Sequence, residues 1–413
     1  MLKDVPVVKD LIKRCLRCGL CREVCPVFNE TKREDDSPRG KIFYVEMLRN
    51  GELDTNRAVD AKLFNCLLCE SCSNICPSSI PVDEIITAAR GESAKVNSHP
   101  LKRWVYNKLW TSPGKLRLFV KSLGFGQRMG LIGLGRAAGF THILPGDMPR
   151  AERIMGRIPK KSAREILPAV SPAIGPRKYR VVYFLGCGTD LLYPEIALAA
   201  VKVLTNLGCE VDIVPELKCC GLPQLGNGEE NSARELAAFN TGLINIRDAD
   251  AIISDCASCS STLKSHLYRG LFRAGYDEKI TDVQVFIAKI AGTFKPDNAI
   301  APITVTYHDS CHLSKAMKIT REPRELLKRI PGVTFVEMDD ADKCCGGSGT
   351  FPMSHYDLSM KILDRKVASI AKSGAGIVAA ACPGCITQIG FGVKEKKMDV
   401  KVMHPLEIMA EMF

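Results

Sequence analysis

Cysteine is the residue whose spacing in this 413-residue chain predicts chemistry, because 18 of its 19 cysteines fall into two patterns that each occur twice. The first pattern is C-x-x-C-x-x-C-x-x-x-C-P, and it comprises Cys15, Cys18, Cys21 and Cys25, then Cys66, Cys69, Cys72 and Cys76. The second pattern is a single cysteine, a Cys-Cys-Gly triplet and a C-x-x-C pair, and it comprises Cys187, Cys219, Cys220, Cys256 and Cys259, then Cys311, Cys344, Cys345, Cys382 and Cys385. Both patterns indicate thiolates that converge on iron–sulfur clusters.

The first pattern predicts two 4Fe-4S cubane clusters. Three cysteines at i, i+3 and i+6 can surround one corner of a cubane, and the fourth cysteine, before proline, ligates the other cluster in two-cluster ferredoxins. One cluster is therefore expected on Cys15, Cys18, Cys21 and Cys76, and the other on Cys66, Cys69, Cys72 and Cys25. Zinc can also be held by four cysteines, but its sites usually come from two separated pairs, so iron is the better interpretation.

The second pattern offers five thiolates in each copy, which is more than a zinc ion or an ordinary cubane binds. Either one thiol is spare, or the metal centre is opened so that more sulfur can bind, or neighbouring thiols form a redox-active disulfide. The spacing alone leaves these alternatives open. Structural disulfides fit less well, because adjacent cysteines and cysteines three residues apart suit convergence on a metal better than the linking of distant segments.

Repeated cysteines require repeated secondary-structure elements to position them. The second copy of the pattern follows the first at a nearly constant offset, which is 124 residues between Cys187 and Cys311 and 126 residues between Cys259 and Cys385. Strands are predicted at 179–184, 210–214 and 251–254, alternating with helices at 195–207 and 232–247. The same order returns as strands at 303–307, 333–338 and 376–381 with helices at 321–330 and 354–372. This order predicts two homologous α/β domains, each with a parallel sheet and with cysteines at the carboxyl edge of its strands.

The chain therefore divides into four predicted segments. Residues 1–92 are expected to form a mostly helical two-cluster domain, with helices after Pro38 and from Val82, and residues 93–178 a linker segment rich in proline. Residues 179–297 and 298–413 are the two duplicated α/β domains. An apolar content of 46% is enough for more than one core.

The net charge of +11 is concentrated in the linker segment, where residues 95–164 contain 15 lysines and arginines against two acids, Asp147 and Glu152. We expect either a solvated linker packed over the two halves or a docking surface for anionic lipid or an acidic protein. No nucleic-acid-binding motif lies nearby. Because the sequence has neither a signal peptide nor an apolar run of 18 residues, a cytoplasmic protein is expected, peripheral at a membrane through a partner.

These motifs resemble a group of iron–sulfur subunits that combine a two-cluster ferredoxin module with two cysteine-rich CCG domains. The group includes iron–sulfur subunits of glycolate oxidase, anaerobic glycerol-3-phosphate dehydrogenase and D-lactate oxidoreductases, and the heterodisulfide reductase catalytic subunit. The similarity covers nearly the whole chain and is weakest over residues 95–178. Residues 37–41 (Ser-Pro-Arg-Gly-Lys) and 344–351 (Cys-Cys-Gly-Gly-Ser-Gly-Thr-Phe) are most similar to the glycolate or lactate oxidase type.

The resemblance implies an electron-transfer subunit of a flavin-dependent glycolate or D-lactate oxidoreductase, with two cubanes and one or two centres at the CCG motifs. FAD is then expected on a partner dehydrogenase subunit, and an electron-transfer flavoprotein or a membrane quinone or cytochrome subunit is left open as a further partner. The alternative is a disulfide or heterodisulfide reductase with non-cubane 4Fe-4S clusters, because both C-x-x-C pairs are intact. Its catalytic residues would then be Cys311, Cys344, Cys345, Cys382 and Cys385.

Other polar residues near the motifs carry weaker signals. Cys209 belongs to neither pattern and is expected to be a small buried hydrophobic residue. His308 and His312 flank Cys311 and are expected either to hydrogen-bond cluster sulfur or supply a proton, or only to satisfy a strand end.

Two further groups of residues are assigned no chemistry. Gly133-x-Gly135-x-x-Ala138 follows no clear strand, so it is not expected to bind a nucleotide, which supports a flavin elsewhere. Five acids in predicted loops are expected to be solvated: Asp309, Glu337, Asp339, Asp340 and Asp342.

Overall fold

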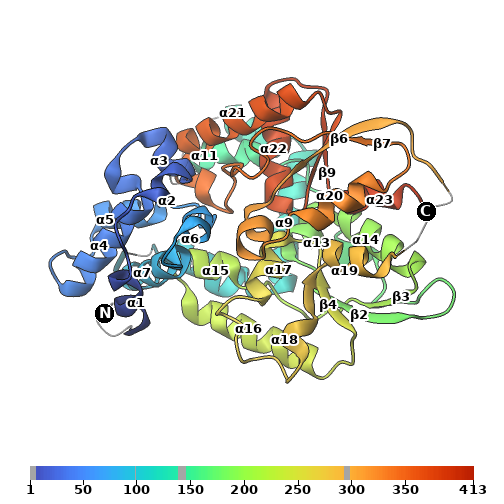
Figure 1. Ribbon diagram of the computed structural model, residues 1–413, viewed down its shortest axis with the longest axis horizontal. Helices are drawn as coiled ribbons and strands as arrows, with labels where there is room; N and C mark the ends of the chain where they lie inside the picture. The colour runs from blue at the N-terminus through green and yellow to red at the C-terminus, as the bar shows by residue number, and fades with distance from the viewer. Residues whose placement is uncertain (1–5, 98, 138–145, 293–297) are drawn as a thin grey trace.

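The computed structural model describes residues 6–97, 99–137, 146–292 and 298–413. The predicted segments also include residues 1–5, 98, 138–145 and 293–297, which lie outside this description. A helical N-terminal unit lies beside two α/β units (Figure 1). No helix within the described ranges is long and apolar enough to cross a membrane.

The N-terminal unit, here called the ferredoxin module, consists of short helices around a small core. Its elements are α1 (Pro6–Lys13), α2 (Leu20–Glu23), α3 (Pro26–Thr31), η2 (Glu34–Asp36), α4 (Pro38–Asn50), α5 (Arg57–Phe64), α6 (Ser71–Ile75) and α7 (Val82–Asn97). Helix α4 begins where the Ser37 hydroxyl accepts a hydrogen bond from Gly40 N, with Pro38 at the first helical position, and it ends at Gly51 in the left-handed conformation. The predicted helices after Pro38 and from Val82 are both present, and they pack on each other through Val45 and Ile86.

A single buried arginine of α7 joins the ferredoxin module to the first α/β unit. The Arg90 guanidinium, whose residue is 4% exposed, donates to the carbonyls of Leu63 and Cys66 within the module and of Gly226 in the first α/β unit. Gly228 lies against the same turn of α7, and a Cβ there would stand 2.5 Å from the Arg90 carbonyl oxygen. The two units therefore meet at a closely packed, hydrogen-bonded contact.

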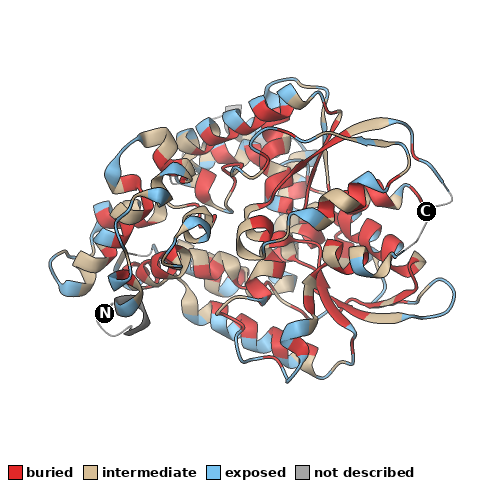
Figure 2. Cartoon of the chain, in the orientation of Figure 1, coloured by how far each residue is buried: buried red, intermediate tan, exposed pale blue. Residues whose placement is uncertain are grey.

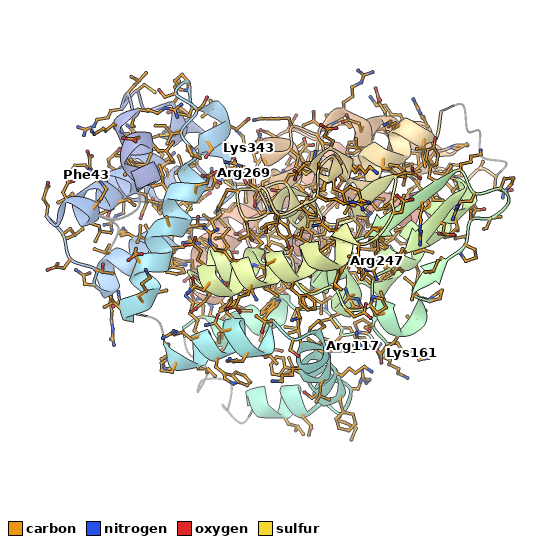
Figure 3. All side chains as sticks on the ribbon, turned by 90° about the horizontal axis from the view of Figure 1, so that it is seen from below. Phe43, Arg117, Lys161, Arg247, Arg269 and Lys343 are labelled. Atoms are coloured by element: carbon orange, nitrogen blue, oxygen red, sulfur yellow. The ribbon has the colours of Figure 1, made fainter. Side chains whose placement is uncertain are left out.

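The linker segment crosses from one α/β unit to the other. Its helices are α8 (Pro100–Trp104), the π-helix η3 (Val105–Leu109), α9 (Pro113–Arg128), α10 (Leu131–Ala137), α11 (Met148–Ala151), η5 (Glu152–Ile154) and α12 (Ala163–Ile166). Leu116 of α9 packs on Leu191 of the first unit, whereas Arg150 pairs with Asp357 of the second. Figure 3 shows Arg117 on the linker helices, which form the lower edge of the molecule in that view. Gly133 and Gly135 lie in α10, and Ala138 lies outside the described residues.

The first α/β unit contains a five-stranded sheet in the order β1-β3-β2-β4-β5. Its strands are β1 (Val170–Ser171), β2 (Tyr179–Tyr183), β3 (Cys209–Asp212), β4 (Ala251–Ser254) and β5 (Ile280–Asp282). Its helices are α13 (Cys187–Leu192), α14 (Pro194–Asn206), α15 (Leu222–Gly226), α16 (Glu230–Asn245), α17 (Ala257–Leu263), α18 (Tyr276–Lys279) and α19 (Val283–Ile290). Strand β1 pairs antiparallel with β3, and the other pairings of these strands are parallel, as in the register Val181 to Val211 and to Ala251.

The second α/β unit repeats this arrangement with four parallel strands in the order β7-β6-β8-β9. They are β6 (Ile303–His308), β7 (Val333–Phe335), β8 (Ile377–Ala380) and β9 (Lys401–Met403). The accompanying helices are η6 (His312–Ala316), α20 (Arg321–Lys328), η7 (Phe351–Met353), α21 (Tyr356–Ser373), α22 (Pro383–Glu395) and α23 (Pro405–Ala410). The predicted α/β class with parallel sheets is confirmed, and β1, β5 and β9 are additional edge strands, of which the antiparallel β1 comes from the predicted linker segment.

The two α/β units share their core. One cluster of buried side chains includes Phe184 and Ile252 of the first unit together with Val378 and Ile389 of the second. Figure 2 shows the central strands of both sheets mostly buried, whereas the edge strands β7 and β9 are partly exposed.

Hydrogen bonds to backbone carbonyls also join the two units. Ala257 N donates to Ala381 O at 2.8 Å, and His404 Nε2 donates to Asp255 O at 2.9 Å. Such bonds fix the two carboxyl strand edges against each other.

Candidate iron–sulfur sites

The first ferredoxin set is Cys15, Cys18, Cys21 and Cys76, and these four cysteines line one pocket. Arg17 and Gly19 both have left-handed backbone conformations, with φ of 53° and 90°, which turn the loop so that its cysteines face inward. Cys18 is exposed, so this pocket lies at the surface of the module. Burial raises the pKa of the Cys21 thiol to about 11, and a cation at this site would oppose that effect.

The second ferredoxin set is Cys66, Cys69, Cys72 and Cys25, which line a second pocket. Its loop repeats the first one, since Leu68 and Glu70 have φ of 50° and 58°. Cys72 lines both pockets. The structure therefore brings together the four cysteines predicted for each cubane, including the exchange of Cys25 and Cys76 between the motifs.

The first CCG set lies at the carboxyl edge of the first sheet, as the sequence predicts. Cys187 begins α13 after β2, Cys256 caps α17 after β4, and Cys219 and Cys220 lie in the loop between β3 and α15. Cys187 Sγ is 4.0 Å from Cys219 Sγ. Hydrogen bonds from Cys219 and Cys259 lower the pKa of the Cys220 thiol well below its ordinary value, and the same hydrogen bonds raise the pKa of the Cys219 and Cys259 thiols.

The second CCG set repeats this placement in the second sheet. Cys311 precedes η6, Cys382 caps α22, and Cys385 Sγ lies 3.6 Å from Cys345 Sγ. Gly346 has φ of 83°, and a Cβ there would stand 2.7 Å from the Ser359 carbonyl oxygen. The glycine after the double cysteine is therefore required by the backbone conformation and by the close approach of α21.

The cysteine sets adjoin one another across the unit boundaries. Cys25 and Cys69 of the second ferredoxin set share a cluster of side chains with Cys311 and Cys344 of the second CCG set. Ser258, between two cysteines of the first CCG set, places its Oγ 3.5 Å from Cys382 Sγ of the second. The four sets thus follow one another through the molecule.

His312 lies at the junction of three units. Its Nε2 donates to Leu68 O of the ferredoxin module at 3.2 Å, and its Nδ1 lies 2.8 Å from Ser258 Oγ of the first α/β unit. Burial lowers the pKa of His312, but the negative charges of Cys311 and Glu70 outweigh it and raise this pKa to about 9. The imidazole therefore favours its charged form among the thiolates.

The donor sets fit iron–sulfur clusters. All 19 cysteines lie in the described part of the chain, all are free thiols, and 18 of them gather in four sets of four or five. Thiolate sulfur is the ligand that such clusters require.

Residues outside the four sets differ in how well the sequence anticipated them. Cys209 is fully buried in β3, as expected for a small hydrophobic residue. The prediction that Asp309 is solvated is wrong, because it is 5% exposed and receives two hydrogen bonds from Arg324, at 2.8 and 2.9 Å. No role was predicted for Trp110, whose ring packs beside Cys187 and whose buried indole N–H, together with the stronger effect of Cys219, lowers the pKa of the Cys187 thiol.

Comparisons with known proteins agree with this architecture. Residues 181–264 and 305–390 match the family model of the CCG cysteine-rich domain, and residues 11–80 match that of the 4Fe-4S dicluster domain. Residues 98–155 match the model of the glycolate oxidase iron–sulfur subunit linker region.

The relatives of this chain include subunits of oxidoreductases. The chain is 32% identical to the probable glycolate oxidase iron–sulfur subunit of Bacillus subtilis (strain 168), over 96% of this chain and 93% of that protein. It is 26% identical to a subunit of the dihydromethanophenazine:CoB–CoM heterodisulfide reductase of Methanosarcina mazei, over 96% and 93%. It is 30% identical to lactate utilization protein A of an Exiguobacterium species, over 56% of this chain and 97% of that protein.

Fold and sites together define an iron–sulfur electron-transfer subunit of an oxidoreductase. Within that class, the chain belongs to the CCG-domain family of glycolate oxidase iron–sulfur subunits. Relatives of this kind are subunits of larger assemblies, so a partner subunit belongs with this chain as well.

Proposed function

We propose that this chain passes electrons between an FAD-binding dehydrogenase subunit, which oxidises glycolate or D-lactate, and a further acceptor. The main observation that supports this proposal is the serial arrangement of the four cysteine sets. Iron–sulfur clusters bound by these sets would supply one-electron carriers. The similarity to a glycolate oxidase subunit and to lactate utilization protein A supports a small 2-hydroxyacid as the substrate of the partner.

The residues proposed to hold the clusters are the four sets themselves. The first ferredoxin set begins the series at the exposed Cys18, and Cys72 connects it to the second set. Contacts around Phe351 then lead to Cys311, and Ser258 bridges from Cys382 to the first CCG set. The series ends at Cys187, beneath the linker helix α9.

Burial of the CCG thiols favours this relay over disulfide reduction at the same sites. Seven of the ten CCG cysteines are buried: Cys219, Cys220, Cys256, Cys259, Cys345, Cys382 and Cys385. A disulfide substrate must reach the metal centre, whereas an electron carrier can be covered. The similarity to the heterodisulfide reductase of Methanosarcina mazei and the two intact C-x-x-C pairs keep disulfide reduction as the second candidate.

Anaerobic purification with native partners tests the proposal. We expect a brown, iron-containing complex with an FAD-binding chain that reduces the clusters when glycolate or D-lactate is added, as followed by electron paramagnetic resonance. Cys69→Ser should abolish this reduction beyond the first ferredoxin set, whereas Cys209→Ala, which removes a thiol outside the sets, should not. Turnover of a disulfide without a flavoprotein would instead support the second candidate.

A further inference from the structure

The two CCG sets differ at one buried position three residues before their single cysteine. In the first unit this residue is Phe184, and in the second it is His308 at the end of β6. Both are almost completely buried, at 0% and 1% exposure. The five cysteines are otherwise repeated at equivalent positions, so this substitution gives the second set a donor atom that the first set lacks.

Neither ring nitrogen of His308 has a hydrogen-bond partner among the described residues. Two other imidazoles near the sets are satisfied: His312 by Leu68 and Ser258, and His404 by Asp255 O and Leu406 N. A polar group that is buried without a hydrogen-bond partner destabilises the folded state. The polar groups beside His308 in the described chain are the thiols of Cys345 and Cys385, so at least one ring nitrogen is left without a partner there.

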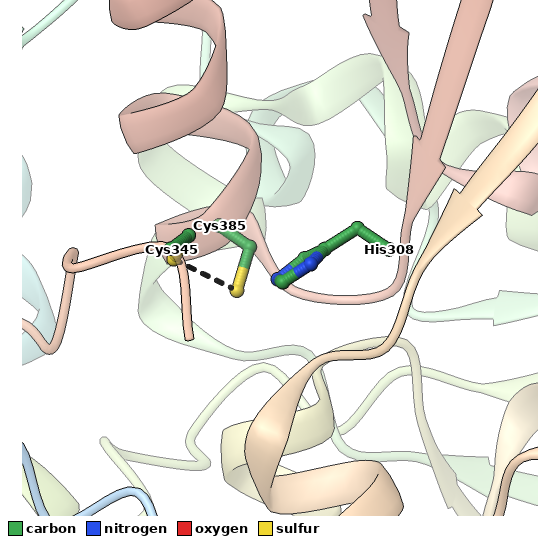
Figure 4. A group of neighbouring side chains, drawn as sticks. All are labelled: His308, Cys345 and Cys385. Atoms are coloured by element: carbon green, nitrogen blue, oxygen red, sulfur yellow. Dashed lines mark hydrogen bonds between the residues drawn. The ribbon is translucent and has the colours of Figure 1, made fainter. Parts of the chain in front are cut away.

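The side chain of His308 points toward two cysteines of the second CCG set (Figure 4). One ring nitrogen of His308 and the sulfurs of Cys345 and Cys385 all lie within 4.8 Å of one another. Cys385 is in the first turn of α22 and Cys345 in the loop before η7, so three separate segments converge there. This spacing leaves room for one metal ion to contact all three atoms.

We propose that His308 is a nitrogen ligand of the iron–sulfur centre at the second CCG set, beside Cys345 and Cys385. The inference rests on the proposed function, in which this set holds such a centre. Imidazole is an established iron ligand in iron–sulfur centres, and replacing thiolate by neutral imidazole raises the reduction potential. The two CCG centres then have different ligand sets, and the second has the higher potential.

The test uses the full chain, loaded with iron and sulfide under anaerobic conditions and labelled with 15N-histidine. Pulsed electron paramagnetic resonance should show a strong 15N hyperfine coupling to one centre. The coupling should disappear in His308→Phe, which copies the residue of the first unit, and in His308→Gln, which keeps a polar side chain if phenylalanine impairs folding. It should persist in the matched control His312→Gln.

Redox titration provides a second measurement. The midpoint potential of one CCG centre should fall in both His308 variants, because a spare thiolate can take the vacant position, while the other three centres keep their potentials. Iron at the second set without the 15N coupling, or a coupling that survives in the His308 variants, would overturn the ligand assignment alone. A second set that binds no iron in the wild type would overturn the proposed function as well.

Discussion

Ser258 of the first α/β unit lies 3.5 Å, Oγ to Sγ, from Cys382 of the second, and the thiols of Cys256 and Cys382 also contact each other, so the two CCG sets meet directly. Because Cys256 and Cys382 cap their helices on either side of this contact, metal centres bound there lie close together.

We predict that the two CCG centres interact magnetically when both are paramagnetic. Their resonance lines should broaden as the second centre is reduced, and Cys256→Ser, which removes one ligand of the first centre, should sharpen the signal of the second. Electron paramagnetic resonance during stepwise reduction measures this. Identical spectra of the second centre in wild type and variant would contradict the prediction.

The two ferredoxin sets should differ in their sensitivity to air. Cys18 is exposed, whereas Cys69 is 8% exposed and lies against the second α/β unit. Oxygen should therefore destroy the cluster of the first set before that of the second. Iron analysis after timed exposure should show an early loss of about four iron atoms per chain. Cys18→Ser should already lack those atoms, and a two-stage loss that persists in this variant would disprove the assignment.

Arg90→Met should loosen the contact between the ferredoxin module and the first α/β unit. The variant leaves the carbonyls of Leu63, Cys66 and Gly226 without their buried donor, at a cost of roughly 3 kcal/mol. Thermal unfolding and limited proteolysis of α7 measure the effect. The exposed Arg103→Met in the linker segment is the control and should change stability by less than about 0.5 kcal/mol. Equal melting temperatures for the two variants would contradict the prediction.

Asp282 should make stability depend on pH. The carboxyl group is fully buried at the start of α19 and accepts hydrogen bonds from Gln284 and Ser260, and burial raises its pKa from 3.8 to about 7. Between pH 3.8 and about 7, the folded state therefore keeps a proton that the unfolded state has lost. The contribution of the neutral Asp282 to folding stability is fully present below pH 3.8 and is lost as the pH rises through 7.

Asp282→Asn keeps the acceptor for Gln284 but cannot ionise. The variant should be more stable than the wild type at pH 8, by on the order of 3 kcal/mol, with the difference shrinking toward pH 4. Melting temperatures of both proteins across this range provide the measurement. If the two melting temperatures differed by the same amount at every pH, the pKa of Asp282 would not differ between the folded and unfolded states.

Much of the fold could be predicted from periodicity and repetition in the sequence. The central strands and the helices α14, α16 and α21 occur within a few residues of their predicted positions, because apolar runs and cysteine offsets repeat in both halves. The edge strands β1, β5 and β9 could not be predicted, since they have only two or three residues each and alternation cannot be detected over so short a length.

The cysteine sets were predictable, but their order in space was not. Spacing along one loop shows which thiols can converge, whereas the approach of Cys69 to Cys311 depends on packing around Phe351 and Ile362. The expected exposure of Asp309 failed for a similar reason, because its partner Arg324 comes from a different element. His308 was noticed from its position beside Cys311, but only burial without a partner distinguishes it from His312.

The bond from Ala257 N to Ala381 O has no counterpart on the other side of the molecule. At the offset of 126 residues, the equivalent donor to Asp255 O would be Pro383, which has no N–H, and His404 of the second half bonds to that carbonyl instead. The two α/β units are therefore not interchangeable, because neither could make these two hydrogen bonds with a second copy of itself. They form an asymmetric pair within one polypeptide, in which each supplies a contact that the other cannot.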